Sequence, residues 1–174
     1  MLDNKRQKTL FSREEISVRV QALGKEIASD YKSKELVVVS LLRGSFIFTA
    51  DLVRELSIPV EVDFMTTSSY GHSETSSGKV DIVQDLRANI EGKDVLIVDD
   101  IMDSGVTLEN VVKHLKSKSP NSIKICVMLD KPSRRKVDLS PDYVGFTIPD
   151  LFIVGYGLNY GDLYRNIPYI FTFE

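Results

Sequence analysis

Three carboxylates and two hydroxyls lie close together in the middle of the chain. The carboxylates are Asp99, Asp100 and Asp103, and the chain continues with Ser104, Gly105, Val106 and Thr107. The residues before them, 95–98, are branched and apolar and have the length of a strand buried on both faces. An amphipathic helical pattern follows over 111–115. The spacing therefore predicts a strand, a tight acidic loop and a helix N-terminus.

This loop has the chemistry of a site for a phosphorylated sugar. In open α/β sheets ligands bind beyond the carboxyl ends of strands, where a helix N-terminus offers free N–H groups and a positive dipole end. A phosphate therefore suits residues 104–107. Carboxylates repel a phosphate, so Asp99 and Asp100 are expected to meet hydroxyls, a metal ion or an acidic N–H.

Other interpretations fit less of this run. A solvated loop with a helix cap is the ordinary reading of an isolated Asp-Ser-Gly, but not of the whole segment. Receiver domains of signalling proteins also have a strand that ends in two acids, yet theirs lies near the start of the domain and this one begins at Val95. The Gly-x-x-x-x-Gly-Lys-Ser/Thr loop of nucleotide hydrolases does not occur in the sequence.

Strand and helix patterns alternate on both sides of the loop. A capping box, Ser12 to Glu15, starts a helix whose apolar residues recur at helical spacing to about Tyr31. Apolar strands are predicted over 36–42 and 123–129, and a helix follows the first of them. This alternation predicts an α/β fold with a mainly parallel sheet and helices on both faces.

Two further segments depart from the alternation. Residues 60–64 alternate between apolar and acidic, which predicts a half-exposed strand near a sheet edge. The polar, glycine-flanked residues 68–79 then predict a long flexible flap, from which 80–86 returns as a strand. Near the C-terminus, short apolar strands over 143–148 and 152–156 are predicted to form a small hood.

Length and composition favour one domain. The 174 residues can bury a full hydrophobic core as a single domain. The single cysteine, Cys126, lies in an apolar run and is expected to be buried. The N-terminus lacks an apolar segment, so we expect no secretory signal, no membrane span and a cytoplasmic location.

Charge argues against a nucleic-acid partner. The net charge is −3, whereas affinity for nucleic acid rests on many phosphate contacts by Lys and Arg. The one basic cluster comprises Lys131, Arg134, Arg135 and Lys136. We expect it to be a solvated loop with one or two ligand contacts. His72 and His114 have no metal-ligand spacing and receive no chemical role.

The segment from Val95 to Thr107 resembles the 5-phosphoribosyl-1-pyrophosphate (PRPP) signature of type I phosphoribosyltransferases: a strand, two acids, two apolar residues and Asp-Ser/Thr-Gly-x-Thr. The flanking stretches resemble the hypoxanthine and hypoxanthine-guanine members in order and spacing: Leu42-Arg43-Gly44, Ser69-Tyr70-Gly71, Asp142 to Phe146, Ile148-Pro149-Asp150 and Phe152 to Arg165. The resemblance implies a core mainly parallel sheet flanked by helices, with a small hood and a flexible flap. It implies a core at about 36–140 and a hood from about 141–174 plus some of the N-terminus. It also implies transfer of ribose 5-phosphate from PRPP to N9 of a 6-oxopurine, with Mg²⁺ and release of pyrophosphate.

The same resemblance implies a role for individual residues. Asp99 and Asp100 would hold the ribose hydroxyls and Mg²⁺, residues 103–107 the 5′-phosphate, and Asp103 would be the general base near purine N7. The remaining assignments are Arg43, Gly44 and Arg165 to pyrophosphate, with an often cis peptide after Leu42; Lys131, Phe152 and Ile153 to the purine; and Ser69 and Tyr70 to the flap. Lys131 would contact the 6-oxo group, Phe152 would stack on the base, and Ile153 would contact its edge through the backbone.

Two residues depart from the family pattern. Asp99 stands where Glu is usual and should still reach a hydroxyl, whereas Asn159 stands where Asp is the usual ligand of a second Mg²⁺. The resemblance implies a homodimer or homotetramer. The rivals are an enzyme that prefers guanine or xanthine and a PRPP-sensing regulator that binds RNA or DNA. The regulator would need an added DNA-binding segment or a strongly basic face, and the sequence has neither.

Overall fold

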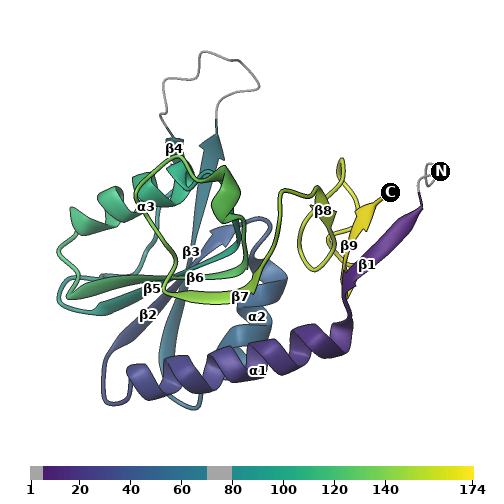
Figure 1. Ribbon diagram of the computed structural model, residues 1–174. Coiled ribbons are helices and arrows are strands. Elements are labelled where there is room, and N and C mark those ends of the chain that lie inside the picture. Colours follow the sequence, from purple (N-terminus) through teal and green to yellow (C-terminus); the bar gives the residue numbers. More distant parts are fainter. Residues whose placement is uncertain (1–5, 70–79) are drawn as a thin grey trace.

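A six-stranded sheet forms the centre of the computed structural model, which describes residues 6–69 and 80–174 (Figure 1). Its strand order is β4-β3-β2-β5-β6-β7, and every neighbouring pair is parallel except β3 with β4. These strands are β2 (Leu36–Leu42), β3 (Val60–Ser69), β4 (Val80–Gln84), β5 (Asp94–Met102), β6 (Ser122–Asp130) and β7 (Tyr143–Thr147). The predicted α/β fold with a mainly parallel sheet is confirmed.

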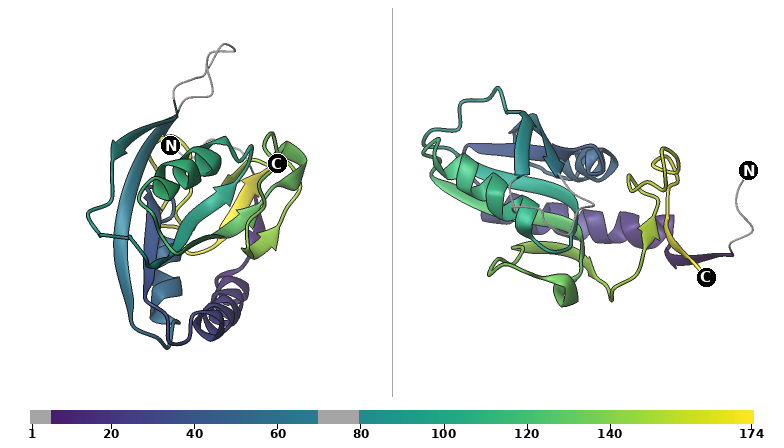
Figure 2. Two further views of the ribbon diagram at one scale, coloured as in Figure 1. Left: turned by 90° about the vertical axis from the view of Figure 1, so that its left-hand side faces the viewer. Right: turned by 90° about the horizontal axis from the view of Figure 1, so that it is seen from above.

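Helices cover both faces of this sheet (Figures 1 and 2). They are α1 (Arg13–Asp30), α2 (Phe46–Arg54), α3 (Val106–Lys116) and the short 3₁₀ helix η1 (Pro132–Arg134). Alternate strand residues point to opposite faces. Val38 and Leu96 pack with α1 and α2, whereas Val37 and Ile97 pack with α3. Burial on both faces explains why β2 and β5 read as continuous apolar runs.

The first helix begins as its sequence predicts. Ser12 Oγ accepts a hydrogen bond from the Glu15 N–H at 3.1 Å, and Glu15 Oε2 accepts one from the Ser12 N–H at 2.8 Å. The helix ends at Asp30, with Tyr31 as its C-terminal cap. Arg19 then ties α1 to the sheet, because its Nε donates to the Gly145 carbonyl of β7 at 2.8 Å.

The hood is a separate three-stranded sheet in the order β1-β9-β8, at one end of the molecule (Figure 1). Its strands are β1 (Gln7–Phe11), β8 (Ile153–Val154) and β9 (Ile170–Phe173). Both chain ends therefore contribute to it. The expectation that 143–148 belongs to the hood is wrong, because β7 pairs with β6 and completes the core sheet. A short apolar strand fits either sheet, and its sequence does not carry the pairing partner.

The edge hairpin has the predicted form where the structure describes it. Val62 and Phe64 on β3 are 38% and 39% exposed, while Met65 on the opposite face is buried. β4 returns antiparallel to β3. The predicted flap lies mostly at 70–79, outside the described residues. In the described part of the chain no helix is long and apolar enough to cross a membrane.

The crossing of α1 and α2 depends on Gly24. A Cβ at this position would lie 2.9 Å from the Glu55 carbonyl oxygen. Gly24→Ala is expected to lower the free energy of unfolding by about 1–3 kcal/mol through overpacking, although Ala favours a helix by about 1 kcal/mol. Urea denaturation measures the change. The exposed neighbour supplies the control, Lys25→Ala, and equal stabilities for the two variants would contradict this packing account.

Candidate active site

The candidate site lies at the carboxyl ends of the parallel strands, at the end of the core sheet that is nearer the hood (Figure 1). β5 delivers Asp99 and Asp100, and the next loop delivers Asp103. This loop and the start of α3 line a cavity of about 120 Å³, whose lining residues are Asp99, Ile101, Met102, Asp103, Ser104, Gly105, Thr107 and Leu108. The sequence analysis predicted this combination of strand end, acidic loop and helix N-terminus.

The loop is shaped to present a helix N-terminus to the cavity. Gly105 caps α3 at a φ of 83°, a conformation that favours glycine. A Cβ there would also lie 2.7 Å from Val137 Cγ2. Ser104 Oγ accepts a hydrogen bond from the Val106 N–H at 3.3 Å. The first turn of α3 leaves N–H groups without intrahelical partners, and together with Thr107 they can bind an anion.

Asp99 and Asp100 are forced close to one another by the strand end. Burial raises the pKa of Asp99 well above its ordinary value, and the adjacent Asp100 carboxylate raises it further. Burial also raises the pKa of Asp100, although hydrogen bonding with Asp99 and the charge of Arg165 oppose that rise. The pair is therefore suited to receive hydroxyl donors or a cation, both of which favour the charged carboxylates.

Three distant segments meet behind Asp100. A Cβ on Gly44, in the loop after β2, would overlap the Asp100 carboxylate and would lie 3.6 Å from Arg165 Nη1. A Cβ on Gly157 would overlap the Gly44 carbonyl oxygen. Arg165 Nη1 donates to the Gly157 carbonyl at 2.7 Å. Glycine is thus required at two points for the loop after β2, the strand end and the hood to approach this closely.

The loop after β2 has the expected backbone. The peptide between Leu42 and Arg43 is cis, as the family resemblance implies. Arg43 is exposed, so its guanidinium is accessible beside Gly44. Together with Arg165 it gives this corner a positive charge that suits a second anion.

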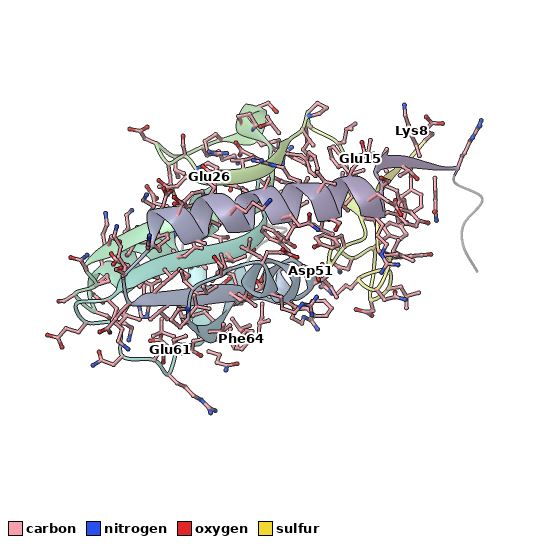
Figure 3. All side chains as sticks on the ribbon, turned by 90° about the horizontal axis from the view of Figure 1, so that it is seen from below. Lys8, Glu15, Glu26, Asp51, Glu61 and Phe64 are labelled. Carbon is pink, nitrogen blue, oxygen red and sulfur yellow. The ribbon has the colours of Figure 1, made fainter. Side chains whose placement is uncertain are left out.

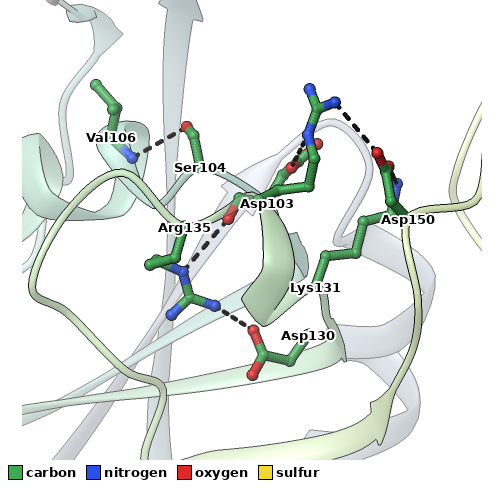
Figure 4. A network of polar contacts seen from close by, with 8 residues as sticks. Asp103, Ser104, Val106, Asp130, Lys131, Arg135 and Asp150 are labelled. Carbon is green, nitrogen blue, oxygen red and sulfur yellow. Dashed lines mark hydrogen bonds and ion pairs between the residues drawn. The ribbon is translucent and has the colours of Figure 1, made fainter.

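On the other side of Asp103, charged side chains alternate in sign (Figure 4). Arg134 Nε lies 3.1 Å from Asp103 Oδ1, and Arg134 Nη1 lies 3.4 Å from Asp150 Oδ2. Lys131 Nζ lies 3.7 Å from Asp150 Oδ1, and the Lys131 side chain is only 8% exposed. These contacts join three segments: the loop after β5, η1, and the segment that leads from β7 to the hood.

The segment that carries Lys131 and Arg134 is firmly anchored. The Lys131 N–H donates to the Met102 carbonyl at 3.0 Å, and the Lys136 N–H donates to the Ser104 carbonyl at 2.9 Å. Arg135 pairs with Asp130 and donates to the Leu139 carbonyl at 2.6 Å. Figure 4 shows Arg135 between Asp103 and Asp130, inside the loop. Within the basic cluster, Arg135 therefore stabilises its own segment, whereas Lys131 and Arg134 contact acidic side chains of the site.

The hood contributes an aromatic surface. Phe152 is 60% exposed and contacts the Tyr160 ring edge to face, with centroids 5.9 Å apart. Ile153, the first residue of β8, is buried. Asn159 Nδ2 donates to the Gly161 carbonyl at 2.6 Å. An exposed, supported ring next to a buried strand can stack on a planar ligand.

The structure brings together some of the predicted site residues, and others lie outside the part of the chain that it describes. Asp99 to Thr107, Gly44 and Arg165 come together, and Asp103 is linked to Lys131 through Arg134 and Asp150. Among the flap residues, Tyr70 is not described, and only the backbone of Ser69 is, as the last residue of β3. The sequence analysis assigned no role to Asp150, Gly157 or Tyr160, although the motif Ile148-Pro149-Asp150 contained a signal for the first.

The carboxylate pair has a consequence for stability. Asp99→Asn is expected to raise the melting temperature of the ligand-free protein at pH 7 by about 2–4 °C, which corresponds to ~1 kcal/mol in a chain of this size. The pKa of Asp99 is raised above 3.8 in the folded state. Below that pH the carboxyl is protonated in both the folded and the unfolded protein, so it does not affect the free energy of unfolding; as the pH rises, it lowers that free energy. The gain should therefore grow between about pH 4 and pH 7.

Thermal unfolding followed by circular dichroism at several pH values measures this difference. Asp138→Asn changes an exposed aspartate and is the matched control. A gain that is the same at every pH, or a loss of stability for Asp99→Asn, would count against the buried carboxylate pair.

Comparison with known proteins gives a consistent result. The family model described as phosphoribosyl transferase domain matches residues 6–161. A hypoxanthine phosphoribosyltransferase of Salmonella typhimurium is 53% identical over 158 residues, which cover 90% of this chain and 89% of that protein. A hypoxanthine-guanine phosphoribosyltransferase of Aquifex aeolicus is 51% identical over 171 residues, covering 98% and 96%. The crystal structure of a Staphylococcus aureus hypoxanthine phosphoribosyltransferase is similar with a TM-score of 0.93 and 45% identity, covering 96% of this chain and 91% of that one.

Proposed function

The chain belongs to the phosphoribosyltransferase family, and we propose that it is a purine-salvage enzyme which transfers ribose 5-phosphate from PRPP to N9 of hypoxanthine or guanine. The observation that carries this proposal is the meeting of the Asp99–Asp100 pair, the helix N-terminus and the Gly44–Arg165 corner at one strand edge. PRPP has hydroxyls, a 5′-phosphate and a pyrophosphate. Each of these groups finds a matching partner there.

The binding roles follow from the chemistry of each part. Asp99 and Asp100 accept hydrogen bonds from the ribose hydroxyls, and the α3 N-terminus with Ser104 and Thr107 holds the 5′-phosphate. Arg43, Arg165 and the close backbone at Gly44 receive the pyrophosphate. On the purine, Lys131 donates to the 6-oxo group, Phe152 stacks on the ring and the Ile153 backbone contacts the edge.

The reaction requires one bond to form and one to break. Purine N9 attacks ribose C1, the bond from C1 to pyrophosphate breaks, and the pyrophosphate leaves with the electron pair. The purine must also lose a proton, and in this proposal Asp103 accepts it at N7. General-base catalysis needs such a carboxylate within hydrogen-bonding reach of the proton. In the described structure the Asp103 side chain is 43% exposed, so its carboxylate is accessible to a ligand.

Mg²⁺ fits the same edge. Carboxylate and amide oxygens are hard donors that suit this ion; Asp99 and Asp100 are the residues that would hold one ion, and Asn159 is the residue that would hold a second. Among the described residues no group of three or more His, Cys, Asp and Glu could bind a metal, so oxygens of PRPP would complete the coordination. When bound, Mg²⁺ supplies neutralisation of the charge on the departing pyrophosphate.

Assembly into a homodimer or homotetramer is supported by an apolar surface on the α2 side of the sheet. Val62 and Phe64 on β3 and Phe46 on α2 are 38%, 39% and 41% exposed. Figure 3 shows Phe64 at the edge of the sheet, beside the region of α2 that carries Asp51. The cytoplasmic location and the lack of nucleic-acid or membrane partners stay predictions of the sequence analysis.

A panel of bases tests the proposed reaction. Hypoxanthine, guanine, xanthine and adenine are each incubated with PRPP and Mg²⁺, and nucleotide and pyrophosphate are measured. We expect equal amounts of both products with hypoxanthine or guanine and little with adenine. Retardation of RNA or DNA on gels in response to PRPP, without nucleotide synthesis, would instead support the regulator.

The general base gives a sharper prediction. Asp103→Asn keeps the shape of the loop but cannot accept a proton, so kcat should fall by about 10²–10⁴-fold while PRPP affinity stays within about twofold, or ~0.4 kcal/mol. Rapid-quench assays and PRPP titration separate the two quantities. Unchanged turnover in this variant would remove Asp103 from the chemistry.

The neutral side chain at position 159 predicts an unusual Mg²⁺ requirement. Mg²⁺ prefers carboxylate oxygen, and the Asn159 amide also donates to the Gly161 carbonyl, a bond that Asp could not make. Asn159→Asp should therefore lower the Mg²⁺ concentration that gives half the maximal rate, while the loop around Gly161 becomes less ordered. Mg²⁺ titration at saturating PRPP for both proteins checks this. Coincident curves would contradict the prediction and would mean that Asn159 serves as well as Asp or that position 159 does not bind the metal.

A further inference from the structure

The two residues assigned to the purine edge, Asp103 and Lys131, are the ends of a row of four charged side chains. In the order of contact they are Asp103, Arg134, Asp150 and Lys131, with separations of 3.1, 3.4 and 3.7 Å. Arg134 is central because two different nitrogens of one planar guanidinium contact two carboxylates. Nε faces Asp103 and Nη1 faces Asp150.

The ends of this chain of charges differ in how firmly they are held. Lys131 is fixed by its buried side chain and by the bond from its N–H to the Met102 carbonyl. Asp103 has a 43% exposed side chain on a loop, and Arg134 Nε contacts its carboxylate. The backbone at Arg134 is itself fixed, because its N–H donates to the Lys131 carbonyl at 3.1 Å and η1 begins with Pro132.

A 6-oxopurine presents O6 and N7 side by side on one edge. An acceptor at N7–H and a donor at O6 bind it together only if their separation matches that edge. A 6-aminopurine has an amino group, which is a hydrogen-bond donor, at the position that faces the Lys131 ammonium. Two donors cannot pair, so the same arrangement disfavours 6-aminopurines. The spacing between Asp103 and Lys131 is thus the quantity on which purine selection depends.

We propose that Arg134 and Asp150 are positioning residues that set this spacing and so contribute to selection of 6-oxopurines. The proposal rests on the proposed function, since it takes Asp103 and Lys131 as the purine contacts. Exposed ion pairs contribute little to folding. The planar fork of arginine, in contrast, fixes the geometry of two acceptors at once, which the single ammonium of lysine does not do.

The experiment compares four variants with the wild type: Arg134→Gln, Asp150→Asn, the double variant and Arg134→Lys. KM and kcat are measured for hypoxanthine, adenine and PRPP, and melting temperatures show that each variant is folded. Lys113→Gln is the control, because Lys113 forms an exposed ion pair with Glu109 on α3 at 3.2 Å, away from the purine edge.

Arg134→Gln should raise KM for hypoxanthine about tenfold, equivalent to ~1.4 kcal/mol, and reduce the preference for hypoxanthine over adenine. KM for PRPP should match that of the control. Arg134→Lys should recover only part of the loss, because it restores the charge and not the fork. The losses caused by Arg134→Gln and Asp150→Asn should be less than additive in the double variant, since the two side chains contact each other and act as one unit.

Equal changes in KM for purine and for PRPP, full recovery by Arg134→Lys, or additive effects in the double variant would each overturn the proposal. Variants that behave like Lys113→Gln would also overturn it. If the wild type forms no nucleotide from hypoxanthine and PRPP, the proposed function itself fails and this inference fails with it. An active wild type with unaltered base selection in Arg134→Gln refutes the inference alone.

Discussion

The close approach of the Gly44 loop to the Asp100 carboxylate is the constraint on which the rest of the site depends. There is no room for a Cβ at Gly44, nor at Gly157 where the hood meets the Gly44 carbonyl. Through these contacts the end of β2, the end of β5 and the hood share one corner, and Arg165 is held there by the Gly157 carbonyl. A methyl group at Gly44 would therefore disturb the carboxylate pair and the positive corner together.

The electrostatics of the edge follow from this packing. Two adjacent carboxylates sit in a partly buried corner, where burial raises the pKa of each. Arg165 opposes that rise at Asp100. Without a ligand the edge is thus costly to charge, and hydroxyl donors or a cation would relieve the cost. The carboxylate pair lies next to a helix N-terminus. One ligand can therefore donate hydroxyl hydrogen bonds to the carboxylates and accept hydrogen bonds from the helix N–H groups through its phosphate.

The sequence predicted the parts of the molecule that are local. The capping box, the buried strands around residues 36–42 and 95–98, and the acidic loop are each set by residues within a few positions of one another. It did not predict that 143–147 pairs with β6, because pairing depends on distant segments. For the hood, the family resemblance implied a contribution from the N-terminus but not that its partner strand is β9. The contacts of Arg134 with Asp103 and Asp150 span 31 and 16 residues, so a basic cluster alone could not reveal them.

Calorimetric titration of PRPP with Mg²⁺ into wild type and Gly44→Ala tests the central constraint most directly. Gly92→Ala is the control, because a Cβ at Gly92 would have no atom within 4 Å, so this variant adds a methyl group without overlap, at a position whose φ of 71° already strains an alanine. The account predicts that the dissociation constant for PRPP rises by more than about tenfold, or ~1.4 kcal/mol, in Gly44→Ala and not in Gly92→Ala. A folded Gly44→Ala protein that binds PRPP as tightly as the wild type would contradict it.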